Sequence, residues 1–162
     1  MRHLLALILV SLTLSACGLK PLYSGGSTGA VASTLGTVMV EPIAGNNGWL
    51  MRNALNDRLG SAQSTSAKFR LVVALDDQIE GFGVRADDTV TRERRTLRAR
   101  YQLISLTTGE TVLDATAGAD AGIDVVSSEY ATIASENTAL ENLTQRVADQ
   151  IVTRLSLYAG GE

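Results

Sequence analysis

The sequence predicts an α+β protein in which a four-stranded mixed sheet packs against two helices as a two-layer sandwich. Apolar and polar residues alternate along three segments between residues 69 and 120, which is the two-residue period of half-buried strands. Apolar residues recur at spacings of three and four over residues 49–59 and 129–158, which is typical of helices that cover a sheet. The predicted order of elements is β-α-β-β-β-α.

The first residues have the pattern of a leader peptide. A basic start at Met1-Arg2-His3 precedes an uncharged, mostly apolar run that ends at Leu14. This run is too short for the roughly 20 apolar residues that span a bilayer. Leu14-Ser15-Ala16-Cys17 then resembles the lipobox of bacterial lipoproteins. We therefore expect residues 1–16 to be a signal peptide and Cys17 to carry acyl chains such as palmitate, although an ordinary signal peptide is the alternative.

The residues after the cysteine predict a lipid-anchored tether. Gly18 stands where an aspartate would retain an enterobacterial lipoprotein in the inner membrane, which favours the outer membrane. Ser24 to Thr34 consists mainly of Ser, Gly, Thr and Ala, and such a segment cannot bury enough apolar surface to order itself. We expect residues 17–35 to be the lipidated start and flexible tether, and residues 36–162 to form one domain.

The first expected elements are a short strand and a short helix. Thr37–Glu41 is rich in β-branched residues and is stopped by Pro42. The helix covers 49–59, with Asn46-Asn47-Gly48 as its cap and Gly60 as its stop.

Three strands and a long helix complete the domain. The first and second strands are expected to run parallel if adjacent, and the last three to form an antiparallel meander. Ser127 or Ser128 caps the last helix, which would be about 45 Å long. In order, the remaining elements are a second strand from Phe69, a turn at Gly81-Phe82-Gly83 and Asp87-Asp88, a third strand at about 89–106, a hairpin at Thr107-Thr108-Gly109, a fourth strand from Thr111 to about Asp120, and the helix over 129–158, ended by Gly160-Gly161.

The inventory of reactive residues argues against an enzyme. His3 is the only histidine and leaves with the signal peptide, and the only cysteine is the predicted lipid site. Ser-His, Cys-His and zinc arrangements therefore lack members, and we expect no metal and no cofactor. Removal of Arg2 changes the formal net charge from −3 to −4, which gives no general attraction to nucleic acid.

The charge feature that carries most information is a group of arginines on the third strand. Arg92, Arg94, Arg98 and Arg100 share parity and therefore one face, opposite the apolar face of the strand. Guanidinium groups pair bidentately with phosphates and carboxylates, so this row is a candidate site for a polyanion. The alternative, given equal weight, is cross-strand pairing with Asp76, Gln78, Glu80, Asp114 and Asp120.

The mature start, Cys17-Gly18-Leu19-Lys20-Pro21-Leu22-Tyr23, is similar to the Cys-Gly-Phe-Lys-Pro-Leu-Tyr opening of the LptE family of lipopolysaccharide-assembly lipoproteins, especially the alphaproteobacterial type. Only Leu19 departs from that opening. The helix at 51–59, the meander and the segment Ile151-Val152-Thr153-Arg154-Leu155 also look like the family. The resemblance covers nearly the whole mature chain.

The resemblance implies a non-enzymatic function at the outer membrane. Members of the family act as a plug within the LptD barrel and help to insert lipopolysaccharide into the outer leaflet. They are also held to bind lipopolysaccharide, whose phosphates match the arginine face in charge. The alternative is a periplasmic scaffolding or binding lipoprotein of another envelope complex.

Overall fold

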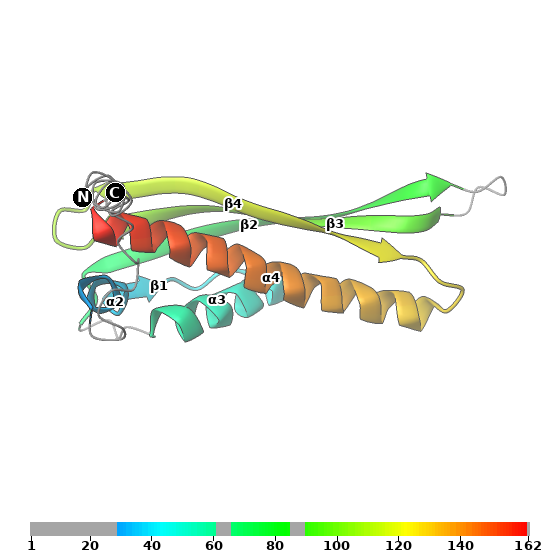
Figure 1. Cartoon of the computed structure of the whole chain (residues 1–162), viewed down its shortest axis with the longest axis horizontal. Coiled ribbons are helices and arrows are strands. Elements are labelled where there is room, and N and C mark those ends of the chain that lie inside the picture. The colour runs from blue at the N-terminus through cyan, green and yellow to red at the C-terminus, as the bar shows by residue number, and fades with distance from the viewer. Residues whose placement is uncertain (1–28, 61–65, 85–89, 162) are drawn as a thin grey trace, which may run out of the picture.

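The computed structural model describes residues 29–60, 66–84 and 90–161. Within them the predicted α+β architecture is confirmed, with the sheet order β1-β2-β3-β4 and the helices on one face (Figure 1). The parallel pairing of β1 with β2 and the antiparallel meander of β2, β3 and β4 also agree with the prediction. The elements are α2 (Ala30–Leu35), β1 (Val38–Val40), α3 (Gly45–Leu59), β2 (Phe69–Val84), β3 (Val90–Ser105), β4 (Thr111–Asp124) and α4 (Glu129–Gly160).

Helix α3 begins earlier than its apolar stripe predicts. Its first residue is Gly45, so the expected cap Asn46-Asn47-Gly48 lies inside the first turn, and the cap residue Ala44 makes no side-chain cap bond. Gly48 is buried, and a Cβ atom at this position would lie 2.5 Å from the backbone oxygen of Ile43. The helix therefore starts on a close backbone contact that only glycine permits.

Strands β2 and β4 extend beyond their predicted ends. Gly81-Phe82-Gly83 belongs to β2 because Phe82 pairs with Arg92 in the ladder, so the predicted turn at these residues is corrected. Strand β4 continues past Asp120 to Asp124, which lies opposite Arg92 on the other side of β3. Asp87-Asp88 lies outside the described residues.

The short helix α2 lies within the range predicted to be tether. Its six residues include only two large apolar side chains, Val31 and Leu35, which stand four residues apart and face the same side. Leu35 is buried and Val31 packs against the core, with α4 in contact with α2. The prediction of a flexible tether is therefore corrected for Ala30–Leu35, and residues 17–28 lie outside the described part of the chain.

Helix α4 runs the length of the sheet (Figure 1). Ser128 caps it by accepting a hydrogen bond from the Ala131 N–H at 3.4 Å, and Gly161 ends it in the left-handed conformation, at φ +84°. The middle of the inner face of β4 consists of small side chains, which lets the helix approach closely. These residues are Ala115, Ala117, Ala119 and Ala121.

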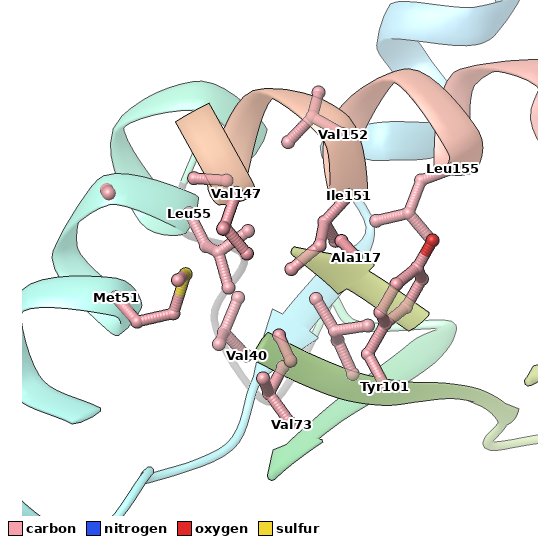
Figure 2. Close-up of a cluster of buried hydrophobic side chains, with 14 of the residues drawn as sticks. Val40, Met51, Leu55, Val73, Tyr101, Ala117, Val147, Ile151, Val152 and Leu155 are labelled. Atoms are coloured by element: carbon pink, nitrogen blue, oxygen red, sulfur yellow. The ribbon is translucent and has the colours of Figure 1, made fainter. Parts of the chain in front are cut away.

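The core lies between the sheet and the two long helices (Figure 2). Tyr101 of β3 is buried beneath Ile151 and Leu155 of α4, and Met51 and Leu55 of α3 are fully buried beside them. This burial of one face accounts for the alternation of apolar and polar residues along β3. Its other face carries the arginines and points away from the helices.

Candidate functional site

The four predicted arginines lie together on the outer face of β3. Arg92, Arg94, Arg98 and Arg100 are all exposed, whereas Leu97 and Ala99 between them are fully buried. The shared face predicted from their parity is therefore confirmed. Whether this face binds a ligand stays a prediction.

Two of the arginines form ion pairs with β4. Arg92 Nε donates to Asp124 Oδ1 at 3.0 Å, and Arg100 Nη2 donates to Asp114 Oδ2 at 3.0 Å. The hydrogen bond from Arg100 lowers the pKa of the Asp114 carboxyl, with a second contribution from the Gln102 amide. Both pairs are largely exposed to water, which screens their attraction, so each pair can open for a competing anion.

The other two arginines are not paired with a carboxylate among the described residues. The Arg94 guanidinium lies 5.4 Å from the centre of the Phe82 ring, a cation–π contact. Arg98 faces Asp76 in the ladder, but the Gln78 amide donates to both oxygens of that carboxylate at 3.1 and 3.3 Å. The predicted pairing of arginines with carboxylates thus holds for some members of the row, through Asp114 and also through Asp124.

A shallow hollow lies beside the unpaired arginine. It has a volume of about 440 Å³ and is lined by Arg98, Arg100 and Asp76, with Gln150 of α4 at its rim. Gly118 forms part of its wall, where a Cβ atom would lie 3.4 Å from Arg98 Cγ. Two guanidinium groups therefore border a space open to a phosphate or carboxylate.

A second polar cluster lies on the inner face of the sheet. Arg95 is only 8% exposed and donates to both oxygens of Asp77 at 2.8 and 2.6 Å. The remaining guanidinium nitrogen of Arg95, Nη1, donates to the backbone oxygen of Glu136 at 2.8 Å. The side-chain amide of Asn47 donates to Asp77 Oδ2 at 2.5 Å. The cluster thus joins β2, β3, α3 and α4.

A pair of carboxylates adjoins this cluster. Burial raises the pKa of the Glu93 carboxyl, and the negative charge of Glu136 together with a hydrogen bond between the two side chains raises it further. Glu93 Oε2 is buried without a hydrogen-bond partner among the described residues. The Glu93 carboxyl therefore holds its proton more tightly than an ordinary glutamate does.

The outer arginines could be grouped from their parity, but the inner cluster was missed. Arg95 has the parity of Leu97 and Ala99, so it points into the protein. Asp77 has the parity of Leu75 on β2 and points to the same side. Opposite charges at inward positions of two neighbouring strands are the signal that would have predicted a buried ion pair.

Other predictions meet the described residues only in part. Cys17 lies outside the described part of the chain, and its lipidation stays a prediction. Within residues 29–60, 66–84 and 90–161, no group of three or more His, Cys, Asp or Glu side chains could hold a metal ion. The helices in these ranges are also too short or too polar to cross a membrane.

Comparison with known proteins agrees with this architecture. A family model described as "LptE: Lipopolysaccharide-assembly" matches residues 35–155. None of the curated proteins matches the chain at a significant level.

Solved structures of lipoproteins have a similar fold. A candidate lipoprotein from Caulobacter crescentus is 24% identical, with a TM-score of 0.69 over 83% of this chain and 100% of that one. The minor lipoprotein from Acinetobacter baumannii is 12% identical, with a TM-score of 0.62 over 75% and 92% of the two chains. The rare lipoprotein B from Shewanella oneidensis is 8% identical, with a TM-score of 0.61 over 77% and 96%. At these identities the similarity shows a common fold.

Proposed function

Since this chain belongs to the LptE lipopolysaccharide-assembly family, we propose that it is a non-enzymatic outer-membrane lipoprotein that assists an LptD-like barrel and binds lipopolysaccharide through its arginine face. Family membership by itself assigns the chain a role in lipopolysaccharide assembly. The barrel partner, the lipopolysaccharide site and the outer-membrane anchor are the proposed parts.

The unpaired Arg98 beside its hollow is the observation that carries the binding site. Its guanidinium is exposed, has no ion pair among the described residues and borders an open space together with Arg100. A phosphate on lipopolysaccharide accepts two parallel hydrogen bonds from a guanidinium, which is a stronger contact than a neutral hydrogen bond. Arg92 and Arg100 can exchange their exposed carboxylate partners for phosphate at small cost.

Binding of purified lipopolysaccharide to the mature protein in detergent tests this site. We expect the double variant Arg94→Ala, Arg98→Ala to bind roughly tenfold more weakly, because two charge-assisted contacts are lost. The affinity of the parent should also fall as salt is raised. The matched control is Arg146→Ala, which removes an exposed arginine from α4 instead of the sheet. Unchanged affinity in a folded double variant would rule out the arginine face.

Purification through a carboxy-terminal tag tests the partner and the anchor. In the proposed function, detergent extraction brings down the chain with a barrel protein of far greater mass. The mature chain should also begin at an acylated Cys17, which its intact mass reports. Recovery without a barrel, or with a different envelope complex, would support the alternative of a periplasmic scaffolding lipoprotein.

A further inference from the structure

Strand β4 forms one edge of the sheet, and its hydrogen-bonding groups alternate in direction. The Val125 N–H donates to Thr91 of β3, so odd-numbered residues bond inward. Even-numbered residues turn their backbone groups toward the open edge. Gly118 confirms this alternation because its N–H and C=O bond to a side chain beyond the edge, that of Gln150.

The side chain of Gln150 bonds to the backbone of one edge residue, Gly118, and leaves the edge after it without a partner among the described residues. Its amide donates to Gly118 O at 3.2 Å and accepts from Gly118 N at 3.1 Å, as a neighbouring strand would. By the same alternation, Asp120, Gly122 and Asp124 point their backbone groups outward. No hydrogen bond from the described residues reaches these groups. An exposed edge of this kind is a template for a further strand.

A groove runs beside this open part and is lined by β4 and the first half of α4. Helix α4 comes directly after β4 in the chain and runs back along the sheet (Figure 1). The groove has a volume of about 550 Å³, and its helix wall extends from Ala134 to Arg146. That wall is about 18 Å long, which matches about five residues of extended chain. Small side chains, including Ala134, Ser135 and Ala139, keep it open.

We propose that β4 binds an extended segment of a partner protein, which adds as a fifth strand along residues 120–124 and places its inward side chains in the groove. The partner strand carries basic residues on its outer face. Asp120 and Asp124 lie on that face, and Asp120 has no ion pair among the described residues. A cross-strand lysine or arginine would therefore be stabilised.

A second copy of the chain fits this edge poorly. The antiparallel register that pairs residues 120–124 with themselves has its twofold axis at Gly122. It places Asp120 of each copy opposite Asp124 of the other, and like charges directly opposite each other are destabilising. The charge pattern therefore selects a different, basic strand. This inference is independent of lipopolysaccharide binding.

A synthetic peptide of alternating lysine and valine, with both ends blocked, tests the proposal on the mature protein in detergent. We expect it to bind with lysines opposite Asp120 and Asp124, and to slow hydrogen exchange at the amides of Asp120, Gly122 and Asp124. The same peptide N-methylated on alternate residues keeps its charge but cannot form the ladder, so it should bind roughly tenfold more weakly.

Two variants at Gly122 separate strand addition from attraction by charge alone. Gly122→Pro removes the outward N–H but no bond to β3, and proline is tolerated at such edge positions. We expect it to weaken peptide binding roughly tenfold. Gly122→Ala keeps the N–H, and no atom lies within 4 Å of the added Cβ, so its affinity should be unchanged.

Several results would overturn the proposal. The peptide would not bind, or its N-methylated form would bind as tightly as the unmodified peptide. A Gly122→Pro variant that melts like the parent would bind the peptide as tightly as the parent does, or slower hydrogen exchange would be confined to residues outside 120–124. If Gly122→Pro does not fold, Asp120→Lys provides the test. It should weaken binding of the lysine peptide and strengthen binding of an alternating glutamate and valine peptide, and no change in either affinity would also overturn the proposal.

Discussion

The guanidinium of Arg95 forms a two-point ion pair with the carboxylate of Asp77 on the inner face of the sheet, with N–O distances of 2.8 and 2.6 Å. Both side chains are nearly buried, at 9% and 12% exposure. The hydrogen bond to Asp77 raises the pKa of the Arg95 guanidinium, although burial acts in the opposite direction. Asn47 and the backbone of Glu136 satisfy further polar groups. The pair thus positions both long helices against the sheet.

Removal of one partner should be costly. We expect Arg95→Ala to lower the free energy of unfolding by about 3 kcal/mol or more, because a nearly buried carboxylate then lacks its counter-ion. Urea unfolding followed by circular dichroism measures this loss. Replacing both partners, by Arg95→Leu with Asp77→Leu, should recover much of it. The control Arg98→Ala, on the exposed face of the same strand, should change stability by less than about 0.5 kcal/mol.

The fold could be predicted from the sequence because the spacing of apolar residues along β2, β3 and α4 matches the residues that are buried. The outer arginines could be grouped for the same reason, since parity alone assigns them to one face. The two-residue period does not show where a ladder ends. Gly81-Phe82-Gly83 looks like a turn until its pairing with Arg92 is known.

What could not be predicted depends on contacts distant in sequence. Helix α2 has only six residues, which is too short for a helix to be stable alone, and Leu35 is buried only where the core is assembled. Arg95 was assigned no partner because Asp77 lies eighteen residues away on the neighbouring strand. Parity places both charges on the inner face, but only the register between β2 and β3 shows that the two side chains meet.

The carboxyl pair of Glu93 and Glu136 should make stability depend on pH. Burial first, and then the charge of Glu136, raise the pKa of Glu93 above its ordinary value of 4.5, so the folded state binds this proton more tightly than the unfolded state. The free energy of unfolding contributed by this group therefore falls as pH rises from 4.5 through the folded pKa. Above the folded pKa, the loss of stability caused by ionising Glu93 has reached its full size.

Glu93→Gln should remove this cost, because the amide is neutral at all pH values and can donate to Glu136. We expect the variant to be more stable than the parent at neutral pH, with the difference shrinking below pH 4.5. Urea unfolding across that pH range provides the measurement. The control Glu141→Gln alters an exposed carboxylate on α4 and should show no such trend. A constant difference at all pH values would contradict a raised pKa at Glu93.

Gly48 should not tolerate even one added methyl group. A Cβ atom would lie 2.5 Å from Ile43 O and 2.6 Å from Ile43 C, both backbone atoms that cannot move aside cheaply. Alanine favours helices by about 1 kcal/mol over glycine, but the clash outweighs this gain. We expect Gly48→Ala to destabilise the protein by about 1–3 kcal/mol in thermal or urea unfolding. Gly122→Ala, at a site with open space, is the matched control, and equal effects of the two changes would contradict this reading.

The side chain of Gln150 should protect one backbone amide at the sheet edge. The Gly118 N–H donates to Gln150 Oε1 at 3.1 Å and has no strand beyond it, so its protection depends on that side chain. We expect Gln150→Ala to speed hydrogen exchange at Gly118 roughly tenfold while leaving Ala117 and Ala119, which bond to β3, unchanged. Gln145→Ala removes an exposed glutamine of α4 that bonds to Arg58 instead, and should leave Gly118 unaffected. Faster exchange along all of β4 would indicate general loosening instead of a local bond. A selective change at Gly118 would identify Gln150 as the group that occupies the edge where a fifth strand would otherwise continue.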